Sequence, residues 1–378
     1  MKYICEHFIP VSNSENRIFA LSSNDKADYI SFVLHQLNVN TEFISPSITR
    51  NKKIYFKRSD SKSAFQKVIS GPTLGNVFSY HIQHLFAKIW LLVFLLLNCK
   101  RGELILSYHG IMKIPVMLIL KKIKRIKICL EVEELYYEIN AQKSLSKWRK
   151  WLEQLMIRSA DSYIFASQQL ANRCNKQNKP FAIANGRYIS EPIIAQPDND
   201  GLIHILYAGL IRTGKVAFNC LNIADYLSSK YCLHIIGYGE QADIIELEKN
   251  IEEKNKKNNC QIVYDGMKRD DEYKAYLQKC HIGLCPLPAN STLQSACFPS
   301  KITSYLANGL RVVTTENEVV RSSVYGKIIT FAKSDNADDF AFSIQQIDFH
   351  NEYDSRTVIQ QCEIRFQKEL IQIIGANK

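Results

Sequence analysis

The chain has 378 residues, of which 46% are hydrophobic and 22% charged, and this balance indicates a folded soluble protein rather than a disordered one. Its 11 cysteines are scattered from Cys5 to Cys362 without a C-x-x-C pair, which argues against a disulfide framework or a zinc site and for a reducing compartment. The net charge of +11 is uneven, since residues 1–190 hold 28 Lys/Arg and 13 Asp/Glu (+15) and residues 191–378 are mildly acidic (−4). This asymmetry predicts a polyanion or an anionic membrane as a partner of the first half, with simple solubility as the alternative.

The length suggests two or three domains, by the usual ~100–200 residues per domain. The first ten residues have no apolar run long enough for a signal peptide. The longest apolar run, Ile89–Leu97, has nine residues, whereas a membrane-spanning helix needs ~20. We therefore expect a cytoplasmic protein.

The first half alternates between predicted strands and helices. Residues 46–75 are polar, and Gly71-Pro72 and Gly75 predict a loop there. The predicted strands are Lys2–Pro10, Thr41–Ser45, Leu104–Tyr108, Ile126–Leu130, Ser162–Ala166 and Phe181–Ala184. The predicted helices are Asp25–Leu37, Ser79–Leu97, Ile111–Ile123, Ser146–Ile157 and Gln168–Asn175.

The second half restarts this alternation after a linker at residues 190–201, which holds two prolines and polar turn residues. Its predicted strands are Ile203–Ala208, Leu233–Ile236, Gln261–Tyr264, Ile282–Pro286, Arg311–Thr315 and Lys327–Phe331, and an amphipathic helix is predicted over Ser355–Ile374. We expect an α/β protein with two Rossmann-like, doubly wound domains, 1–190 and 200–350, facing a cleft. Ligands of such sheets bind at the carboxyl ends of the strands.

The stretch from Ser295 to Val313 predicts a loop, a helix and a buried strand. Pro299 suits the first turn of a helix over Ser300–Ala307, and Asn308-Gly309 suits its end. The free N–H groups of Ser300, Lys301 and Ile302 would form an anion site to which the Lys301 side chain adds a charge. The alternative is an ordinary βαβ unit without a ligand.

Two glycine-containing segments follow strands of the second domain. Gly209–Lys215 places Arg212 and Lys215 in a turn that opens a helix, which suits a diphosphate; solvated loop cations are the alternative. Gly237–Ala242 fits G-x-G-x-x-A, the outline of a dinucleotide fingerprint. Because it lies in the second βαβ unit rather than the first, we favour a tight turn near a nucleotide phosphate or base over a nicotinamide or flavin site.

The second domain resembles the retaining glycosyltransferases of family 4, which have the GT-B architecture. Four landmarks carry the resemblance in order and spacing: ILYAGLIRTGK (205–215), LHIIGYGE (233–240), IVYDGMKRDDEYKAYLQKCHIGLCPLP (262–288) and FPSKITSYLANGLRVVTT (298–315). The first half is similar only loosely, at Glu131–Tyr136, Asp161–Ser167 and Ala184–Gly186, to the closing run of the family's acceptor domain. The resemblance also implies that the terminal helix, about 355–378, packs back on the first domain.

The resemblance implies a donor site in the second domain. Arg212 and Lys215 fall near the family's basic pair on the donor diphosphate, with Leu210 where an arginine is usual, and Lys301 is the lysine of an F-P-S-K motif. The remaining residues implied to bind the donor are Gly209, Gly237, Gly239, Asp265, Gly266, Met267, Phe298, Pro299, Ser300 and Ser304.

The chain departs from the family at two positions. The family's two glutamates, eight positions apart, fall at Ala296 and Ser304. The second glutamate normally holds the ribose, where Ser304 offers one hydrogen bond. The departure makes a weakened or inactive enzyme an open alternative.

Acidic residues end a strand of the first half. Glu131 and Glu133 share one face of an extended segment and Glu134 lies on the other, where carboxylates need water, cations or substrate hydroxyls. We predict that Glu131 and Glu133 act in catalysis and that Glu134, with His109 at the end of LILSY, binds the acceptor. Capping of the following helix and a structural histidine are the alternatives. We see no metal-ligand spacing, in particular no D-x-D ahead of a cleft, so we predict metal-independent transfer without a cofactor, in which cations stabilise the leaving diphosphate.

Apolar and cationic residues adjoin each other in the first half. His84–Leu97 is strongly apolar and is followed by clustered cations and by Trp148 and Trp151, the composition of a surface in the headgroup region of a membrane. The cations are Lys113, Lys121, Lys122, Lys124, Arg125, Lys127, Lys143, Lys147, Arg149 and Lys150. The alternative is a buried helix with solubilising charges nearby.

The sequence therefore predicts a glycosyltransferase. It would transfer a sugar with retention from a nucleotide-diphosphate sugar to a glycan or lipid-linked glycan in cell-surface polysaccharide synthesis. The expected partners are the donor, this acceptor and an anionic membrane surface on the inner face of the plasma membrane, and no nucleic acid. The alternatives are a non-catalytic nucleotide- or glycan-binding protein of the same fold and a nucleotide-sugar 2-epimerase.

Overall fold

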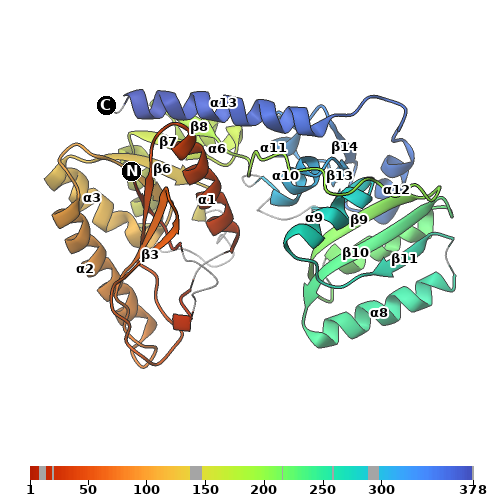
Figure 1. The fold of residues 1–378 in the computed structure, drawn as a ribbon, viewed down its shortest axis with the longest axis horizontal. Coiled ribbons are helices and arrows are strands. Elements are labelled where there is room, and N and C mark those ends of the chain that lie inside the picture. The colour runs from red at the N-terminus through yellow and green to blue at the C-terminus, as the bar shows by residue number, and fades with distance from the viewer. Residues whose placement is uncertain are drawn as a thin grey trace. The chain divides into compact units, whose positions relative to one another are not determined.

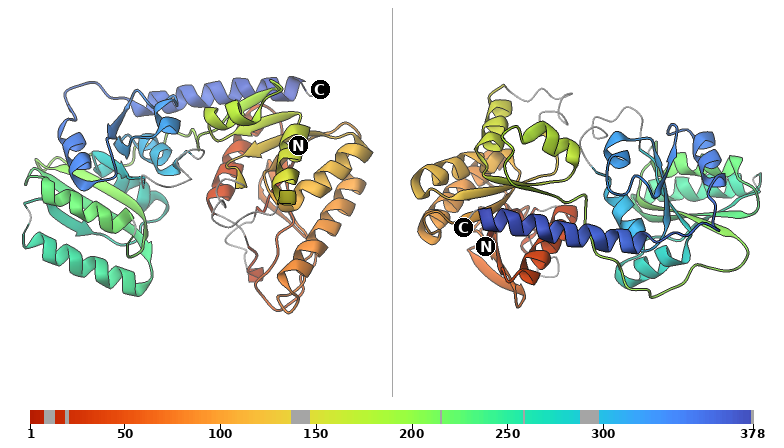
Figure 2. Two further views of the ribbon diagram at one scale, coloured as in Figure 1. Left: turned by 180° about the vertical axis from the view of Figure 1, so that it is seen from behind. Right: turned by 90° about the horizontal axis from the view of Figure 1, so that it is seen from above.

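The structure is a computed structural model that describes residues 1–7, 14–18, 21–136, 147–214, 216–257, 259–287 and 298–376. These residues form two compact units (Figures 1 and 2). Unit 1 comprises Met1–Arg187 and Arg365–Lys378, and unit 2 comprises Tyr188–Ile364. Each unit is built on one twisted sheet with helices on its faces.

The sheet of unit 1 has eight strands in the order β3-β4-β2-β1-β5-β6-β7-β8. All its neighbours pair in parallel except β3 and β4. The chain order reverses at β1, which lies between β2 and β5, so a ligand of this sheet is expected at the carboxyl ends of β1 and β5. The strands are β1 (Lys2–Ile4), β2 (Thr41–Ser45), β3 (Arg58–Ser63), β4 (Gln66–Ser70), β5 (Leu104–Tyr108), β6 (Lys127–Val132), β7 (Ser162–Phe165) and β8 (Phe181–Ile183).

Strands β3 and β4 correct the loop predicted for residues 46–75. They form an antiparallel hairpin with an irregular register between Ser61 and Ser63. β3 reads RSDSKS, with no apolar residue, because it is the edge strand of the sheet, where charge prevents pairing with other chains. β4 buries Val68 and Ile69, but a run this short gives too weak an apolar signal to predict a strand.

The helices of unit 1 lie on both faces of its sheet, with α1 on one side and α2 and α3 on the other (Figure 1). Helix α2 begins where the Ser79 hydroxyl accepts a hydrogen bond from the Ile82 N–H at 3.4 Å. Helix α3 has Pro115 in its first turn, where the missing N–H of proline costs no helical hydrogen bond. The helices are α1 (Leu21–Gln36), α2 (Tyr80–Asn98), the 3-10 helix η2 (Ile111–Lys113), α3 (Ile114–Lys124), α5 (Lys147–Ser159) and α6 (Gln168–Cys174).

The last helix, α13 (Ser355–Ala376), adds its carboxyl-terminal turns to unit 1. Phe366 stacks on Tyr29 with ring centroids 5.8 Å apart. Glu369 accepts a hydrogen bond from the Ile183 N–H of β8 at 2.8 Å. The helix therefore extends both the core and the sheet edge of unit 1.

The sheet of unit 2 has six parallel strands in the order β11-β10-β9-β12-β13-β14. Counted within the unit this order is 3-2-1-4-5-6, the doubly wound arrangement whose ligand site lies where the order reverses, between β9 and β12. The fold class predicted from the sequence is confirmed. The strands are β9 (Ile203–Ile211), β10 (Tyr231–Gly239), β11 (Gln261–Tyr264), β12 (Ile282–Cys285), β13 (Arg311–Thr315) and β14 (Ile329–Ala332).

The core of unit 2 lies between one face of this sheet and helices α7, α8 and α12. Leu233 and Ile235 of β10 point into it, whereas the alternate residues Cys232 and His234 point to the opposite face. The helical segments are α7 (Val216–Leu221), η3 (Asn222–Tyr226), α8 (Gln241–Asn255), α9 (Asp270–Lys279), α10 (Ser300–Ala307), α11 (Glu318–Arg321) and α12 (Ala337–Gln345).

Two local predictions in unit 2 were wrong. β9 and β10 continue to Ile211 and Gly239, so Gly237-Tyr238-Gly239 is paired strand and not a tight turn, and this argues further against a dinucleotide fingerprint. Pro299 caps α10 in an extended conformation rather than lying in its first turn. The predicted helix end is confirmed, because Gly309 has a φ of 90°.

Candidate functional site

Lys301 lies at the carboxyl end of β9 in unit 2. Its Nζ donates to the Tyr207 hydroxyl at 3.1 Å and lies 4.2 Å from the centroid of that ring. In the described part of the chain, no carboxylate lies within ion-pair distance of this ammonium group. Burial lowers the pKa of Lys301. A partly buried cation held by a hydroxyl and an aromatic face keeps its charge available for an anionic ligand.

Glycines make room for this lysine and for a close strand contact. A Cβ on Gly209 would lie 2.6 Å from Lys301 Nζ, so any side chain there would displace the ammonium group. A Cβ on Gly237, whose φ is 151°, would lie 1.8 Å from the Gly209 carbonyl oxygen. The Gly237 N–H donates to the Gly266 carbonyl at 2.9 Å. The structure thus brings Gly209, Gly237 and Lys301 together at the carboxyl ends of β9 and β10, with Gly266 bonded to Gly237 beyond the end of β11.

The amino end of α10 offers fewer free donors than predicted. The Ile302 N–H is already bonded to the Pro299 carbonyl at 3.1 Å, which leaves the N–H groups of Ser300 and Lys301. No side chain caps this end of the helix. Phe298 is buried against Tyr325, with ring centroids 5.6 Å apart, and this contact fixes the segment that enters the helix.

The other residues predicted to bind the donor make contacts of their own, and among the described residues none of them forms a hydrogen bond with the Lys301 side chain. Ser304 Oγ lies 3.4 Å from the Tyr273 hydroxyl, and Met267 is half exposed. Asp265 accepts a hydrogen bond from Tyr276. Gly239 is paired with Ile211 at the ends of β10 and β9.

The turn after β9 presents Arg212 to solvent. Asp243 holds this turn, because it accepts hydrogen bonds from the Thr213 N–H at 2.9 Å and from the Thr213 hydroxyl at 2.6 Å. Arg212 is therefore exposed on a fixed turn three residues beyond Gly209. Lys215 and Ala296 lie outside the described residues.

In unit 1, Glu131 and Glu133 form a carboxyl pair at the end of β6. Glu131 is fully buried and accepts a hydrogen bond from the Tyr3 hydroxyl of β1. Burial, and then the negative charge of Glu133, raise the pKa of Glu131 to about 8. Glu133 pairs with Lys26, whose Nζ also donates to the Ala184 carbonyl at 2.7 Å. At neutral pH one carboxyl is therefore protonated and the other is an ion-paired carboxylate.

His109 is 1% exposed and packs under the segment that follows β6. Its Nδ1–H donates to the Glu134 carbonyl at 3.1 Å, and its Nε2 lies 3.3 Å from Glu153 Oε1. Burial lowers the pKa of His109 to about 4. The Tyr136 hydroxyl donates to the His109 carbonyl at 3.1 Å. These contacts suit a residue that positions Glu134 and its neighbours, which is the structural alternative given above for this histidine.

A pH titration tests the protonation of Glu131. A carboxyl with a pKa near 4.5 when unfolded and about 8 when folded binds more protons in the folded state between these values. The free energy of unfolding should therefore fall as the pH rises from about 5 to 8. In Glu131→Gln this fall should be smaller, because the amide stays neutral. Urea unfolding at several pH values measures it, and an unchanged pH dependence in the variant would refute a protonated Glu131.

Several contacts of these sites could not be found from the sequence. Tyr3 and Lys26 reach the Glu131–Glu133 pair from more than 100 residues away. The sequence indicates a site role for Tyr207 only weakly, because this residue lies on the strand two positions before the predicted turn at Gly209. His204, Cys232 and His234 also lie close together, and this group was not predicted from the sequence. The only signal in the sequence is Cys232-x-His234, which places two side chains of metal-ligand type on one face of a strand.

The comparisons with known proteins identify the fold. No family model matches the sequence, and no curated protein matches it either. Among solved structures, OtsA in its apo form is similar over 98% of both chains, with a TM-score of 0.66 and 13% identity. The E. coli trehalose-6-phosphate structure bound with UDP-2-fluoro glucose covers 100% of this chain and 98% of its own, with a TM-score of 0.65 and 11% identity.

A third similar structure is an alpha,alpha-trehalose-phosphate synthase (UDP-forming) from Burkholderia xenovorans in complex with glucose-6-phosphate. It covers 97% of this chain and 96% of its own, with a TM-score of 0.60 and 9% identity. Identities this low establish a shared fold and nothing finer. The fold is the GT-B fold.

Proposed function

We propose that this protein is a retaining glycosyltransferase that uses a nucleotide-diphosphate sugar, of the F-P-S-K type in family 4. The observation that carries the proposal is Lys301, a partly buried cation without a carboxylate partner among the described residues, at the point of unit 2 where the strand order reverses. A solved structure with this fold is bound with UDP-2-fluoro glucose, which supports a nucleotide sugar as donor. Because that structure is only 11% identical to this chain, the proposal of a nucleotide-sugar donor rests on the chemistry of the Lys301 site.

The proposed mechanism places charge where the leaving group develops it. As the bond from the sugar to the diphosphate breaks, negative charge grows on the diphosphate oxygens, and Lys301, Arg212 and Lys215 would stabilise it. Gly209 leaves room for the Lys301 ammonium group and Gly237 leaves room for the Gly209 carbonyl, so both glycines would keep this cation in place for the diphosphate. These cations can supply the stabilisation that a metal ion gives in other transferases, so we propose metal-independent transfer.

The acidic residues of unit 1 are proposed to serve the acceptor. Glu133 can accept a hydrogen bond from an acceptor hydroxyl. Glu131 is fully buried, so it would position Glu133 through the hydrogen bond between the two carboxyls rather than touch the acceptor. Lys26 pairs with Glu133 and holds its carboxylate in place. Glu134, placed by the His109 ring, would orient the acceptor from the adjoining segment.

We further propose that the acceptor is a lipid-linked glycan and that unit 1 lies on the inner face of the plasma membrane. Five side chains form an apolar stripe along α2 at spacings of three and four residues, and each is 48–78% exposed. They are Ile82, Leu85, Ile89, Val93 and Leu97. Ile119 and Ile123 of α3 and Trp148 and Trp151 of α5 are exposed as well. A patch of this size on a soluble protein marks an interaction surface.

Cations accompany this apolar stripe. Lys147, Arg149 and Lys150 flank the two tryptophans and are exposed, and Lys122 and Arg125 are exposed at the end of α3. Lys113 corrects the sequence prediction, because it is buried and pairs with Glu6 at 2.8 Å. Exposed cations beside apolar and indole side chains favour an anionic membrane over a second protein.

Helix α2 is long and apolar enough to cross a membrane by length and composition, with a mean hydropathy of 1.5, although its longest uninterrupted apolar run is short. Its other face, however, buries Ala87, Leu91 and Leu95 in unit 1. A helix that leaves this core would expose those residues and detach from α3. We therefore propose that α2 lies in the plane of the membrane surface rather than across it.

Hydrolysis of the donor separates transfer from the non-catalytic alternative, which the replacement of the family glutamates by Ala296 and Ser304 keeps open. The protein is incubated with a panel of nucleotide-diphosphate sugars with and without a lipid-linked glycan, and release of nucleoside diphosphate is measured. We expect slow release from one donor, accelerated by the acceptor. No release from any donor would support a binding protein, and a changed sugar without release would support a 2-epimerase.

A further inference from the structure

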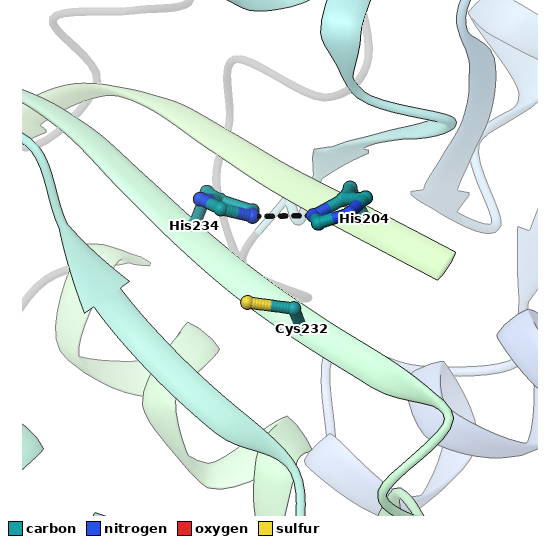
Figure 3. Close-up of side chains that lie close together, drawn as sticks. All are labelled: His204, Cys232 and His234. Atoms are coloured by element: carbon teal, nitrogen blue, oxygen red, sulfur yellow. Dashed lines mark hydrogen bonds between the residues drawn. The ribbon is translucent and has the colours of Figure 1, made fainter. Parts of the chain in front are cut away.

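Three side chains with metal-binding atoms meet on one face of the sheet of unit 2, closer to the amino ends of β9 and β10 than Lys301 and Gly209 of the candidate donor site. Cys232 of β10 is the strand neighbour of His204 of β9, and His234 follows Cys232 on the same face. One ligand atom from each lies within 4.8 Å of the other two (Figure 3). Along β9, His204 is five residues before Gly209, roughly 16 Å at the usual rise of a strand.

The hydrogen bonds of His234 fix which of its nitrogens carries the proton. Tyr276 donates its only hydroxyl proton to Asp265. The Tyr276 oxygen lies 2.8 Å from His234 Nδ1, so this nitrogen must donate to it. In a neutral ring, His234 Nε2 is then unprotonated.

His204 is oriented in the same way from its other side. Its Nε2 lies 3.1 Å from Asp200 Oδ1, and a carboxylate there requires a donor. The remaining nitrogen, Nδ1, faces His234 Nε2 at 2.8 Å (Figure 3). Two neutral rings with these partners would point lone pairs at each other, which is repulsive. The arrangement therefore needs a positive species between the two nitrogens, either one extra proton or a metal ion.

We propose that His204 Nδ1, His234 Nε2 and Cys232 Sγ bind a Zn²⁺ ion. Two imidazoles and one thiolate are ligands that Zn²⁺ prefers, and a water can fill the fourth position. Asp200 and Asp265, the latter through Tyr276, hold the two rings in the orientation that metal-bound histidines commonly take from such outer partners. Tetrahedral binding would need the two nitrogens about 3.3 Å apart, a small rotation from the observed distance.

Cys232 distinguishes the metal from the extra proton. Cys232 is buried, and its thiol proton must leave when the sulfur binds a metal ion. A bound Zn²⁺ would displace that proton and form a thiolate, whereas a proton shared between the two histidines leaves the thiol unchanged. The ion would fasten β9 to β10 at their amino ends and would take no part in the transfer reaction proposed above.

Metal content and cobalt substitution test the site on the full chain, purified without a histidine tag. We expect one Zn²⁺ per chain by elemental analysis after dialysis, and a thiolate-to-metal charge-transfer band when Co²⁺ replaces it. Cys232→Ser and His234→Gln should weaken Zn²⁺ binding by at least about tenfold in competition with a chromophoric chelator. Cys174→Ser, a thiol change in unit 1, is the matched control and should bind as the unmodified protein does.

The cobalt spectrum is recorded on the unmodified protein, so it tests the site even if a variant fails to fold. A thiolate band that appears with one equivalent of Co²⁺ supports the site. Metal bound without such a band indicates binding by surface histidines and overturns the proposal. The absence of stoichiometric Zn²⁺ or Co²⁺ binding also overturns it, and a proton shared between His204 and His234 would then explain their contact.

Discussion

Replacing Lys301 with alanine should lower the turnover number for sugar transfer by about 100- to 1,000-fold, the usual cost of removing one preorganised group that stabilises charge in the transition state. The Michaelis constant for the donor should rise less, because the charge on the diphosphate grows as the glycosidic bond breaks. The fold should survive, since Lys301 forms a hydrogen bond only to Tyr207 among the described residues. Steady-state kinetics measures the effect, with the donor that the panel of nucleotide-diphosphate sugars identifies.

Lys279→Ala is the matched control, because Lys279 is an exposed lysine near the end of the neighbouring helix α9. It should transfer sugar at the normal rate. Circular dichroism and thermal unfolding check that both variants are folded. A folded Lys301→Ala protein with near-normal turnover would contradict the role given to this lysine.

Replacing Leu85, Ile89 and Val93 together by serine should weaken binding to vesicles that contain phosphatidylglycerol by about 100-fold. Each side chain is about half exposed in the protein, so inserting the three into the membrane should contribute about 3 kcal/mol in total. Binding of the unmodified protein should also weaken as salt is raised, because the flanking cations act through a screened field. Vesicle flotation at several salt concentrations measures both effects.

The control for this surface is Ile245→Ser with Phe342→Ser, two changes at exposed apolar positions on α8 and α12 of unit 2. These changes should leave vesicle binding as it is. If the triple variant still floats normally, the stripe on α2 does not face a membrane. If gel filtration shows that it converts a dimer to a monomer, a second copy of the chain covers the stripe.

The sequence predicted helix α2 but not its orientation. Both of its faces are apolar, so periodicity alone could not tell the buried residues Leu91 and Leu95 from the exposed Ile89 and Val93. Only the packing of α2 against the rest of unit 1 decides this. The hairpin β3–β4 was missed for the opposite reason, because a polar edge strand has no apolar pattern to detect.

For the candidate sites, too, the sequence predicted relations between neighbouring residues but not contacts between distant ones. Strand alternation placed Glu131 beside Glu133, and the F-P-S-K motif placed Lys301 at a helix start, because these relations depend on neighbours in the sequence. The partners that set their chemistry, Tyr3 and Tyr207, lie on other strands and come close only through the order of the sheets. A paired strand through Gly239 likewise depends on its register with β9 and could not be read from G-x-G-x-x-A.

Titration calorimetry tests the central claim most directly, by comparing a nucleoside diphosphate with its own nucleoside on the unmodified protein and on Lys301→Ala. The base is chosen from a thermal-shift panel. We predict that the unmodified protein binds the diphosphate at least about tenfold more tightly than the nucleoside, since charge-assisted hydrogen bonds each contribute about 1.5–3 kcal/mol. In Lys301→Ala this preference should largely disappear. Equal affinities for the two ligands in the unmodified protein, or an unchanged preference in the variant, would contradict a diphosphate site at Lys301.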